Sequence, residues 1–151
     1  MAGLLPLLSA QGLATANDFT LKISGNVEQE LVLSLDDLKA LGMTKVRTTS
    51  TWNAEAAEFE GPLVRDVLAK AVAKGKTVTA IASNNFQVPI PVSEFSGFDV
   101  IIAIRENGEP ISRRRKGPAR IVYPRDNHPD EIDINRDSYW VWNLIELQVA
   151  E

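Results

Sequence analysis

The stretch TTSTWNA holds the residues whose types could bind a flat ligand, namely Thr49, Thr51 and Trp52. An indole ring can stack on a planar heterocycle, and threonine hydroxyls can hydrogen-bond to the edge of such a ring. Trp52 could equally pack in the core, and both interpretations stay open because it stands just before an irregular segment. The stretch therefore indicates either one wall of a binding pocket or a piece of core.

A second group is the basic run Arg113–Lys116, which precedes Gly117-Pro118 and Arg120. Guanidinium groups can hold a phosphate or a carboxylate through paired hydrogen bonds. The alternative is a solvated hairpin loop, since exposed charges contribute little unless they have a defined partner. The run alone does not decide between an anion site and a surface loop.

A long acidic loop from Asp126 to Asp137 contains His128, the one histidine of the chain. Carboxylates and an imidazole could bind a divalent ion, but the spacing matches no known metal-binding loop. We interpret the segment as a polar surface loop, and its length is typical of loops that border binding sites. It adds Asp126 to the candidate site residues.

Several kinds of chemistry are excluded by composition. The chain has no cysteine, which removes disulfides, cysteine-type zinc sites, iron–sulfur clusters and thiol catalysis. No glycine elbow surrounds a serine, so a Ser/His/Asp triad is not supported, and no glycine-rich loop is suited to cradle phosphates. The formal net charge of -4 disfavours general binding of nucleic acid.

The elements that must position these residues are short. Alternating apolar residues predict a strand in FTLKISG, which pairs with EQELVLSL across a turn. Ser34 can cap a short helix that ends at Gly42, and Pro62 begins a second helix that ends near Gly75. Asn84-Asn85 is a turn signal. A chain of 151 residues suits one domain, of α+β or mostly-β class.

The second half of the chain reads mainly as strands. FQVPIPVSEF is expected to be extended, because Pro89 and Pro91 do not fit a helix. Asn107-Gly108 predicts the tight turn of a hairpin. YWVWNLIELQV predicts a closing strand, in which alternation puts Trp140 and Trp142 on the same face, with at least one of them in the core.

The first residues indicate export. Residues 1–16 are interpreted as a signal peptide remnant, because Ala14-Thr15-Ala16 fits a cleavage site that leaves residues 17–151 as a single domain. The run is too short to span a membrane. No lysine or arginine precedes Lys22, so an ordinary apolar arm remains the alternative.

Four segments together resemble a known family: FEGPLVRDVLAKA, TVTAIASNNFQVPIPVSEF, NGEPISRRRKGPARIVYPRD and WNLIEL. In order and spacing they are similar to the sulfite-oxidase-like, molybdopterin-binding oxidoreductase domain, over roughly residues 19–149. The resemblance implies an α+β fold of that type, with mixed, mostly antiparallel sheets and short helices. In catalytic relatives a cysteine thiolate ligates molybdenum, and the matching stretch TTSTWNA has none. A threonine hydroxyl does not replace a soft thiolate on this metal.

The resemblance also implies roles for individual residues. Trp52 would stack on a pterin, the two threonines would form the wall on the metal side, and the amides of a turn would meet the ring edge. Basic side chains would meet a polar tail or phosphate. The residues implied, with the weaker candidate last, are Thr49, Thr51, Trp52, Asn84, Asn85, Arg115, Lys116, Arg120 and Asp126.

Small cysteine-free members of this kind resemble periplasmic regulators that bind a metal-free, reduced pterin. Such proteins act on the periplasmic domain of a membrane-bound signalling enzyme, for example one that makes or degrades cyclic di-GMP. We therefore expect a periplasmic pterin-binding protein without catalysis of its own and without direct membrane insertion. One alternative is a molybdopterin-dependent oxidoreductase whose metal keeps only its dithiolene ligands. Another is an interaction module whose pocket is filled by side chains.

Overall fold

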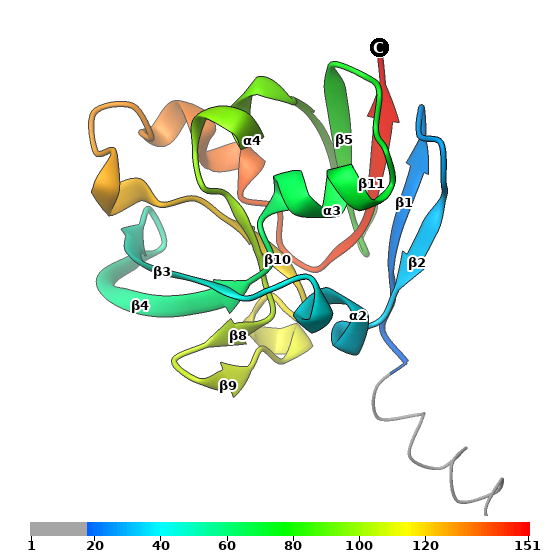
Figure 1. The fold of residues 1–151 in the computed structure, drawn as a ribbon. Helices are drawn as coiled ribbons and strands as arrows, with labels where there is room; N and C mark the ends of the chain where they lie inside the picture. Colours follow the sequence, from blue (N-terminus) through cyan, green and yellow to red (C-terminus); the bar gives the residue numbers. More distant parts are fainter. Residues whose placement is uncertain (1–17) are drawn as a thin grey trace, which may run out of the picture.

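A computed structural model describes residues 18–151, so the predicted signal peptide remnant, residues 1–16, lies outside the described residues. In the described part, three sheets and a few short helices pack around one core (Figure 1). Most strand pairs are antiparallel, which confirms the predicted α+β class with mixed sheets. None of the helices in this part is long and apolar enough to cross a membrane.

The largest sheet has five strands in the order β2-β1-β11-β5-β6. Its central pair, β1 and β11, is parallel, although β11 is the last strand of the chain, and its other pairs are antiparallel. The pairing of β1 with β2 confirms the prediction from sequence. The strands are β1 (Leu21–Gly25), β2 (Leu31–Leu33), β5 (Thr77–Ala82), β6 (Gln87–Pro91) and β11 (Leu144–Ala150).

A four-stranded antiparallel sheet has the order β3-β4-β8-β9, and β7 pairs with β10 in a two-stranded sheet. The predicted tight turn joins β8 to β9, with Asn107 at φ 52° and Gly108 at φ 85°, as a type I′ turn requires. The strands are β3 (Thr44–Ser50), β4 (Asn53–Gly61), β7 (Ile101–Ala103), β8 (Arg105–Glu106), β9 (Glu109–Pro110) and β10 (Arg120–Val122).

The first described helix, α2 (Leu35–Ala40), has the cap that its sequence predicts. Asp37 N donates to the Ser34 hydroxyl at 3.1 Å, and Ser34 N donates back to the Asp37 carboxylate at 3.0 Å. This reciprocal pair satisfies two amides at the helix start. The chain then leaves the helix through Leu41 and Gly42, whose φ of 102° suits glycine.

Two predictions about the other helices are wrong in detail. Helix α3 (Val64–Lys70) was expected to continue to about Gly75, but the chain turns at Val72, whose φ is 52°. There the amide of Ala73 donates to Leu68 O at 3.1 Å and closes the helix end. The stretch expected to be extended contains a helix, α4 (Ser93–Gly97), because the restriction imposed by its prolines ends with β6.

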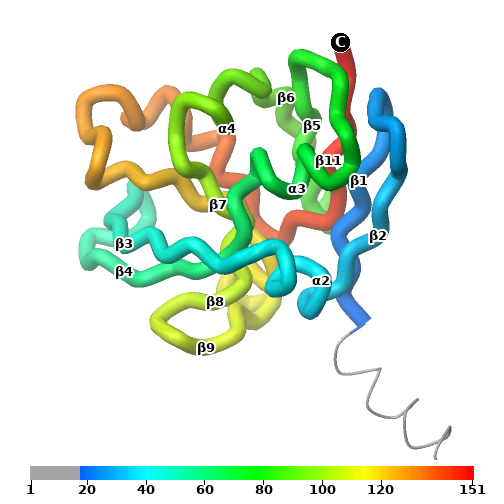
Figure 2. The backbone as a smooth tube through the Cα atoms, viewed as in Figure 1, coloured from blue at the N-terminus to red at the C-terminus, as the bar shows by residue number. Residues whose placement is uncertain are grey.

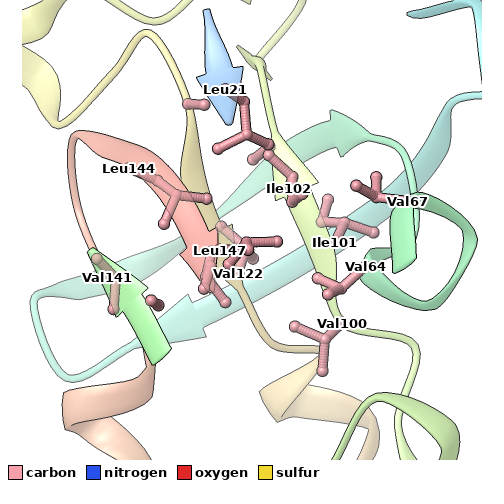
Figure 3. Close-up of a cluster of buried hydrophobic side chains, with 14 of the residues drawn as sticks. Leu21, Val64, Val67, Val100, Ile101, Ile102, Val122, Val141, Leu144 and Leu147 are labelled. Carbon is pink, nitrogen blue, oxygen red and sulfur yellow. The ribbon is translucent and has the colours of Figure 1, made fainter. Parts of the chain in front are cut away.

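The core lies where the three sheets meet (Figure 3). All three residues of β7 are buried, and Ile101 and Ile102 are among the largest fully buried side chains. Val64 and Val67 bring one face of α3 against them, and Leu144 brings the start of β11. Burial of this apolar surface drives the short elements together, since none of them is long enough to be stable alone.

Strand β4 ends where its backbone closely approaches the backbone of β7, a strand buried in the core. A Cβ atom added to Gly61 would lie 1.7 Å from Ile102 O, a backbone atom that cannot move aside. The two segments are joined by hydrogen bonds from Ile102 N to Pro62 O and from Ile104 N to Glu60 O, each 2.8 Å long. Glycine is therefore required at position 61 for β4 to reach the core.

The substitution Gly61→Ala should lower the free energy of unfolding by about 3 kcal/mol, because β4 must move away from β7. Urea unfolding followed by tryptophan fluorescence measures this change. Gly97→Ala is the matched control, since a Cβ there meets nothing within 4 Å, and it should change stability by less than about 0.5 kcal/mol. Equal effects of the two substitutions would contradict the assignment.

Candidate functional site

Three tryptophans from two distant parts of the chain meet at the end of the β3–β4 hairpin. The Trp52 ring lies 5.9 Å from Trp140 and 5.3 Å from Trp142 between centroids, and both contacts are edge-on. Trp140 is buried with 3% of its surface exposed, whereas Trp52 and Trp142 are 39% and 37% exposed. One indole thus supports the cluster from the core, and two keep part of their ring surface exposed.

The tryptophan cavity, as we call it, opens beside these rings and has a volume of about 440 Å³, which lies in the range of small-molecule sites. Apolar side chains form most of its wall, and a few polar groups are spaced along it. Its lining residues are Trp52, Ala82, Asn84, Phe86, Asp137, Ser138, Trp140, Val141, Trp142 and Asn143. The arrangement suits a flat heterocycle with hydrogen-bonding groups at its edge.

Thr49 and Asp126 come together, but they bind each other. Asp126 accepts hydrogen bonds from the Thr49 hydroxyl at 2.6 Å and from Thr49 N at 3.0 Å, and Asp126 N donates to the buried Thr48 hydroxyl at 3.2 Å. The hydrogen bond from the Thr49 side chain is the main cause that lowers the pKa of Asp126 below 3.8. This pair fixes β3 to η3 (Arg125–Asn127), a 3₁₀ turn of the acidic loop.

Thr51 makes a second link between the hairpin and the acidic loop. Its hydroxyl donates to Asp137 Oδ1 at 3.0 Å and accepts from Arg125 Nη1 at 3.4 Å. Asp137 belongs to η4 (Ile134–Tyr139), a second 3₁₀ segment of the acidic loop. Figure 2 shows the hairpin and this loop side by side at one end of the molecule. Neither threonine lines the tryptophan cavity, so their visible role is to hold Trp52 in place.

The two asparagines of the turn between β5 and β6 are placed differently. Asn84 lines the tryptophan cavity, and its Oδ1 accepts from Phe86 N at 3.0 Å, which leaves its amide nitrogen available for a ligand. Asn85 has a φ of 73°, is exposed and lies outside the cavity wall. In this turn, Asn84 is therefore a candidate to hydrogen-bond the edge of a ligand ring, whereas Asn85 serves only to turn the backbone.

Lys116 lies over the tryptophan cluster, with Nζ 4.8 Å from the centroid of the Trp142 ring. Its φ is 82°, and its carbonyl accepts from Asn143 N at 2.9 Å. Asn143 also donates through Nδ2 to Gly117 O at 2.6 Å and to Arg113 O at 3.1 Å. Asn143 thereby ties the basic loop to the strand that follows Trp142.

Arg115 lies on the other side of Trp52, in a second cavity of about 390 Å³. It is paired with Glu106 at 3.3 Å and remains mostly exposed. Trp52 lines both cavities. The basic loop thus borders the site on two sides, with Lys116 over one indole and Arg115 beyond another.

Arg120 is placed apart from both cavities. It is 3% exposed, and its guanidinium carbon lies 5.0 Å from the centroid of the Phe59 ring. Burial lowers the pKa of Arg120 to about 10, and the charge of Glu106 opposes that shift. The side chain is therefore still charged at neutral pH, and its buried Nε has no hydrogen-bond partner within residues 18–151.

Of the residues that line the tryptophan cavity, only Trp52 and Asn84 were among the predicted site residues. The aromatic and polar lining residues that the prediction left out are Trp140, Trp142, Asp137, Ser138, Asn143 and Phe86. The two tryptophans were placed in the closing strand, but β11 begins only at Leu144, and both precede it. At Asn143, whose φ is 51°, the chain leaves extended geometry, so alternation does not apply there. Trp140 is buried, as was expected of at least one of the pair.

The residues of the site supply stacking rings and hydrogen-bonding groups but no set of metal ligands. Stacking rings, an amide and a carboxylate face the tryptophan cavity, which suits a bicyclic ring with polar edges. No group of three or more histidine, cysteine, aspartate or glutamate side chains gathers in a metal-binding arrangement within residues 18–151. The chain has no cysteine, so it offers no thiolate to a soft metal.

The Thr49–Asp126 pair generates a prediction about pH. Because the folded state lowers the pKa of Asp126, its contribution to stability is full above the unfolded pKa near 3.8 and is lost as pH falls through the folded pKa. Asp126→Asn should therefore lower stability by about 1 kcal/mol at pH 6 and by less at pH 2.5, which lies below the unfolded pKa. Thermal unfolding at both pH values measures this, with Asp130→Asn from the same loop as control. A cost that does not depend on pH would refute the prediction.

Comparisons with known proteins agree with this architecture. The family model for the oxidoreductase molybdopterin binding domain matches residues 9–126. A search of curated proteins gave no match. The crystal structure of the sulfane dehydrogenase SoxCD from Paracoccus pantotrophus has a similar fold, with a TM-score of 0.66 and 21% sequence identity over 88% of this chain. The chain spans 38% of that protein. It belongs to the family of oxidoreductase molybdopterin-binding domains and has their sulfite-oxidase-like fold.

Proposed function

We propose that this protein binds a pterin in the tryptophan cavity and carries out no redox chemistry of its own. The observation that carries the proposal is the cavity wall, where Trp52 and Trp142 present exposed indole surface within 5.3 Å of each other. Indole rings bind flat heterocycles by stacking, and polar groups at the rim of such a cavity can meet the edge of the ring. Membership of a molybdopterin-binding family supports a pterin as that heterocycle.

The proposed ligand is a reduced pterin without metal. The family's cofactor supplies molybdenum, held by the pterin dithiolene and, in catalytic relatives, by a cysteine thiolate. This chain has no cysteine. Thr49 lies in the matching stretch, and its hydroxyl donates a hydrogen bond to Asp126. A cavity lined by indole rings, without a metal ligand, favours binding over catalysis. A molybdopterin held through its dithiolene alone is the alternative, and it makes a different prediction about metal content.

We further propose that the bound pterin is sensed by a partner, the periplasmic domain of a membrane-bound signalling protein such as a cyclic di-GMP enzyme. A binding domain without catalysis needs a partner to produce an effect. The rim of the tryptophan cavity supports this, because Phe86, Trp52 and Trp142 are exposed large hydrophobic residues around one opening. A ligand seated among them would alter the surface that a partner contacts.

Isothermal titration under anaerobic conditions should show binding of reduced pterins that weakens at least about tenfold in Trp52→Ala, because a stacking wall is lost. Trp52→Phe should retain part of the affinity. Val32→Ala, at an exposed position on β2 outside the cavity wall, should bind as the parent protein does.

Two outcomes would overturn the proposal. Absence of heat with every reduced pterin tested would contradict pterin binding. Stoichiometric molybdenum in natively exported protein, measured by elemental analysis, would favour the oxidoreductase alternative.

A further inference from the structure

We infer that Asp137 selects the ligand by accepting hydrogen bonds from the amino edge of a 2-amino-4-oxopyrimidine ring. This inference rests on the proposed function and adds the feature of the ring that is recognised. Asp137 is the one charged residue in the described wall of the tryptophan cavity. Its neighbours in that wall include Trp52, whose exposed indole is the proposed stacking surface, so we place the Asp137 carboxylate at the edge of the stacked ring.

The carboxylate of Asp137 is held in a fixed orientation. Its Oδ1 accepts from the Thr51 hydroxyl at 3.0 Å, and that hydroxyl accepts from Arg125 Nη1 at 3.4 Å. Because the hydroxyl receives one hydrogen bond from Arg125, its own proton is directed to Asp137. The chain of donors therefore orients the carboxylate before any ligand arrives, which lowers the entropy cost of binding.

The Asp137 carboxylate can accept further hydrogen bonds. Among residues 18–151 no hydrogen bond or ion pair reaches Asp137 Oδ2, and Oδ1 accepts only from Thr51. The two amides in the wall are partly used, since Asn84 accepts from Phe86 N and Asn143 donates to the basic loop. Asp137 is thus the group best able to accept two further hydrogen bonds.

The amino edge of the ring has the complementary pattern. A 2-amino-4-oxopyrimidine places its exocyclic amine beside the N3–H group, and these two parallel donors match the two oxygens of a carboxylate. A 2,4-dioxo ring of the same shape has a carbonyl at position 2, which would face the negative charge of Asp137. A site that hydrogen-bonds one group rejects the analogue that lacks it, because its own polar group is left unpaired.

Two matched reduced ligands, kept under anaerobic conditions, test this inference: 6-methyltetrahydropterin and 6-methyltetrahydrolumazine. They have the same shape and differ at position 2, where the pterin has an amine and the lumazine has a carbonyl beside a protonated N1. Tryptophan fluorescence titration should show that the parent protein prefers the pterin by about 30-fold. In Asp137→Asn the pterin should lose about tenfold in affinity, while lumazine should bind as well or better, because an asparagine can donate to its carbonyl. A purely structural role for Asp137 would not shift preference between two rings of one shape.

Thr51→Val and Asp130→Asn complete the design. Removing the Thr51 hydroxyl should reduce the preference for pterin without reversing it, and the loop control should leave it unchanged. Equal loss of both ligands in Asp137→Asn, or no preference in the parent protein, would overturn the role of Asp137. Failure of the parent protein to bind either ring would instead contradict the proposed pterin function.

Guanine carries the same amino edge, so guanosine and inosine form a second matched pair. We expect neither to match the affinity of the pterin. A preference for guanosine over inosine that disappears in Asp137→Asn, without pterin binding, would support the edge recognition and identify a purine as its source.

Discussion

The site depends on the hydrogen bonds that attach the tip of the β3–β4 hairpin to the acidic loop. Thr49 and Thr51 reach Asp126 and Asp137 across sequence separations of 77 and 86 residues. Because Trp52 follows directly, these bonds bring its ring to Trp140 and Trp142. Without the attachment, the tip of a two-stranded hairpin would be free to move, and the cavity would have no wall on that side.

The polar residues of the site have different roles from those that their residue types alone suggest. The hydroxyls of Thr49 and Thr51, which could have bound a ligand, instead donate hydrogen bonds to aspartates. One of these aspartates, Asp137, lines the tryptophan cavity. Carboxylates accept more than one hydrogen bond, so Asp137 can serve both the hairpin and a ligand. Glu106 likewise lies between two charges, since it pairs with Arg115 and acts on the buried guanidinium of Arg120.

How far the sequence predicts this molecule depends on the range of the interactions. Local signals gave correct elements: the Ser34 cap, the Asn107-Gly108 turn and the pairing of β1 with β2. These features are set by residues close in the chain. The early end of α3 was missed because Val72 takes a left-handed conformation that its side chain disfavours.

The candidate site was predicted in part for the same reason. The stretch around Trp52 and the turn at Asn84 reach the cavity, and Lys116 reaches its rim. Asp137 and Asn143 carried no local signal, since their roles come from contacts with distant segments. Arg120 could be placed in a strand, but its burial against Phe59 follows from the contact of β4 with β7, the strand that pairs with β10.

The prolines of β6 have a consequence for how this protein meets others. Strand β6 is an outer strand of the five-stranded sheet, and Pro89 and Pro91 have no amide hydrogen to offer there. A sheet with such an edge resists the addition of further strands from other molecules. The turn that leads into β6 carries Asn84 and Phe86 at the cavity mouth. Apolar side chains can therefore stay exposed at that mouth next to a sheet edge that does not template self-association.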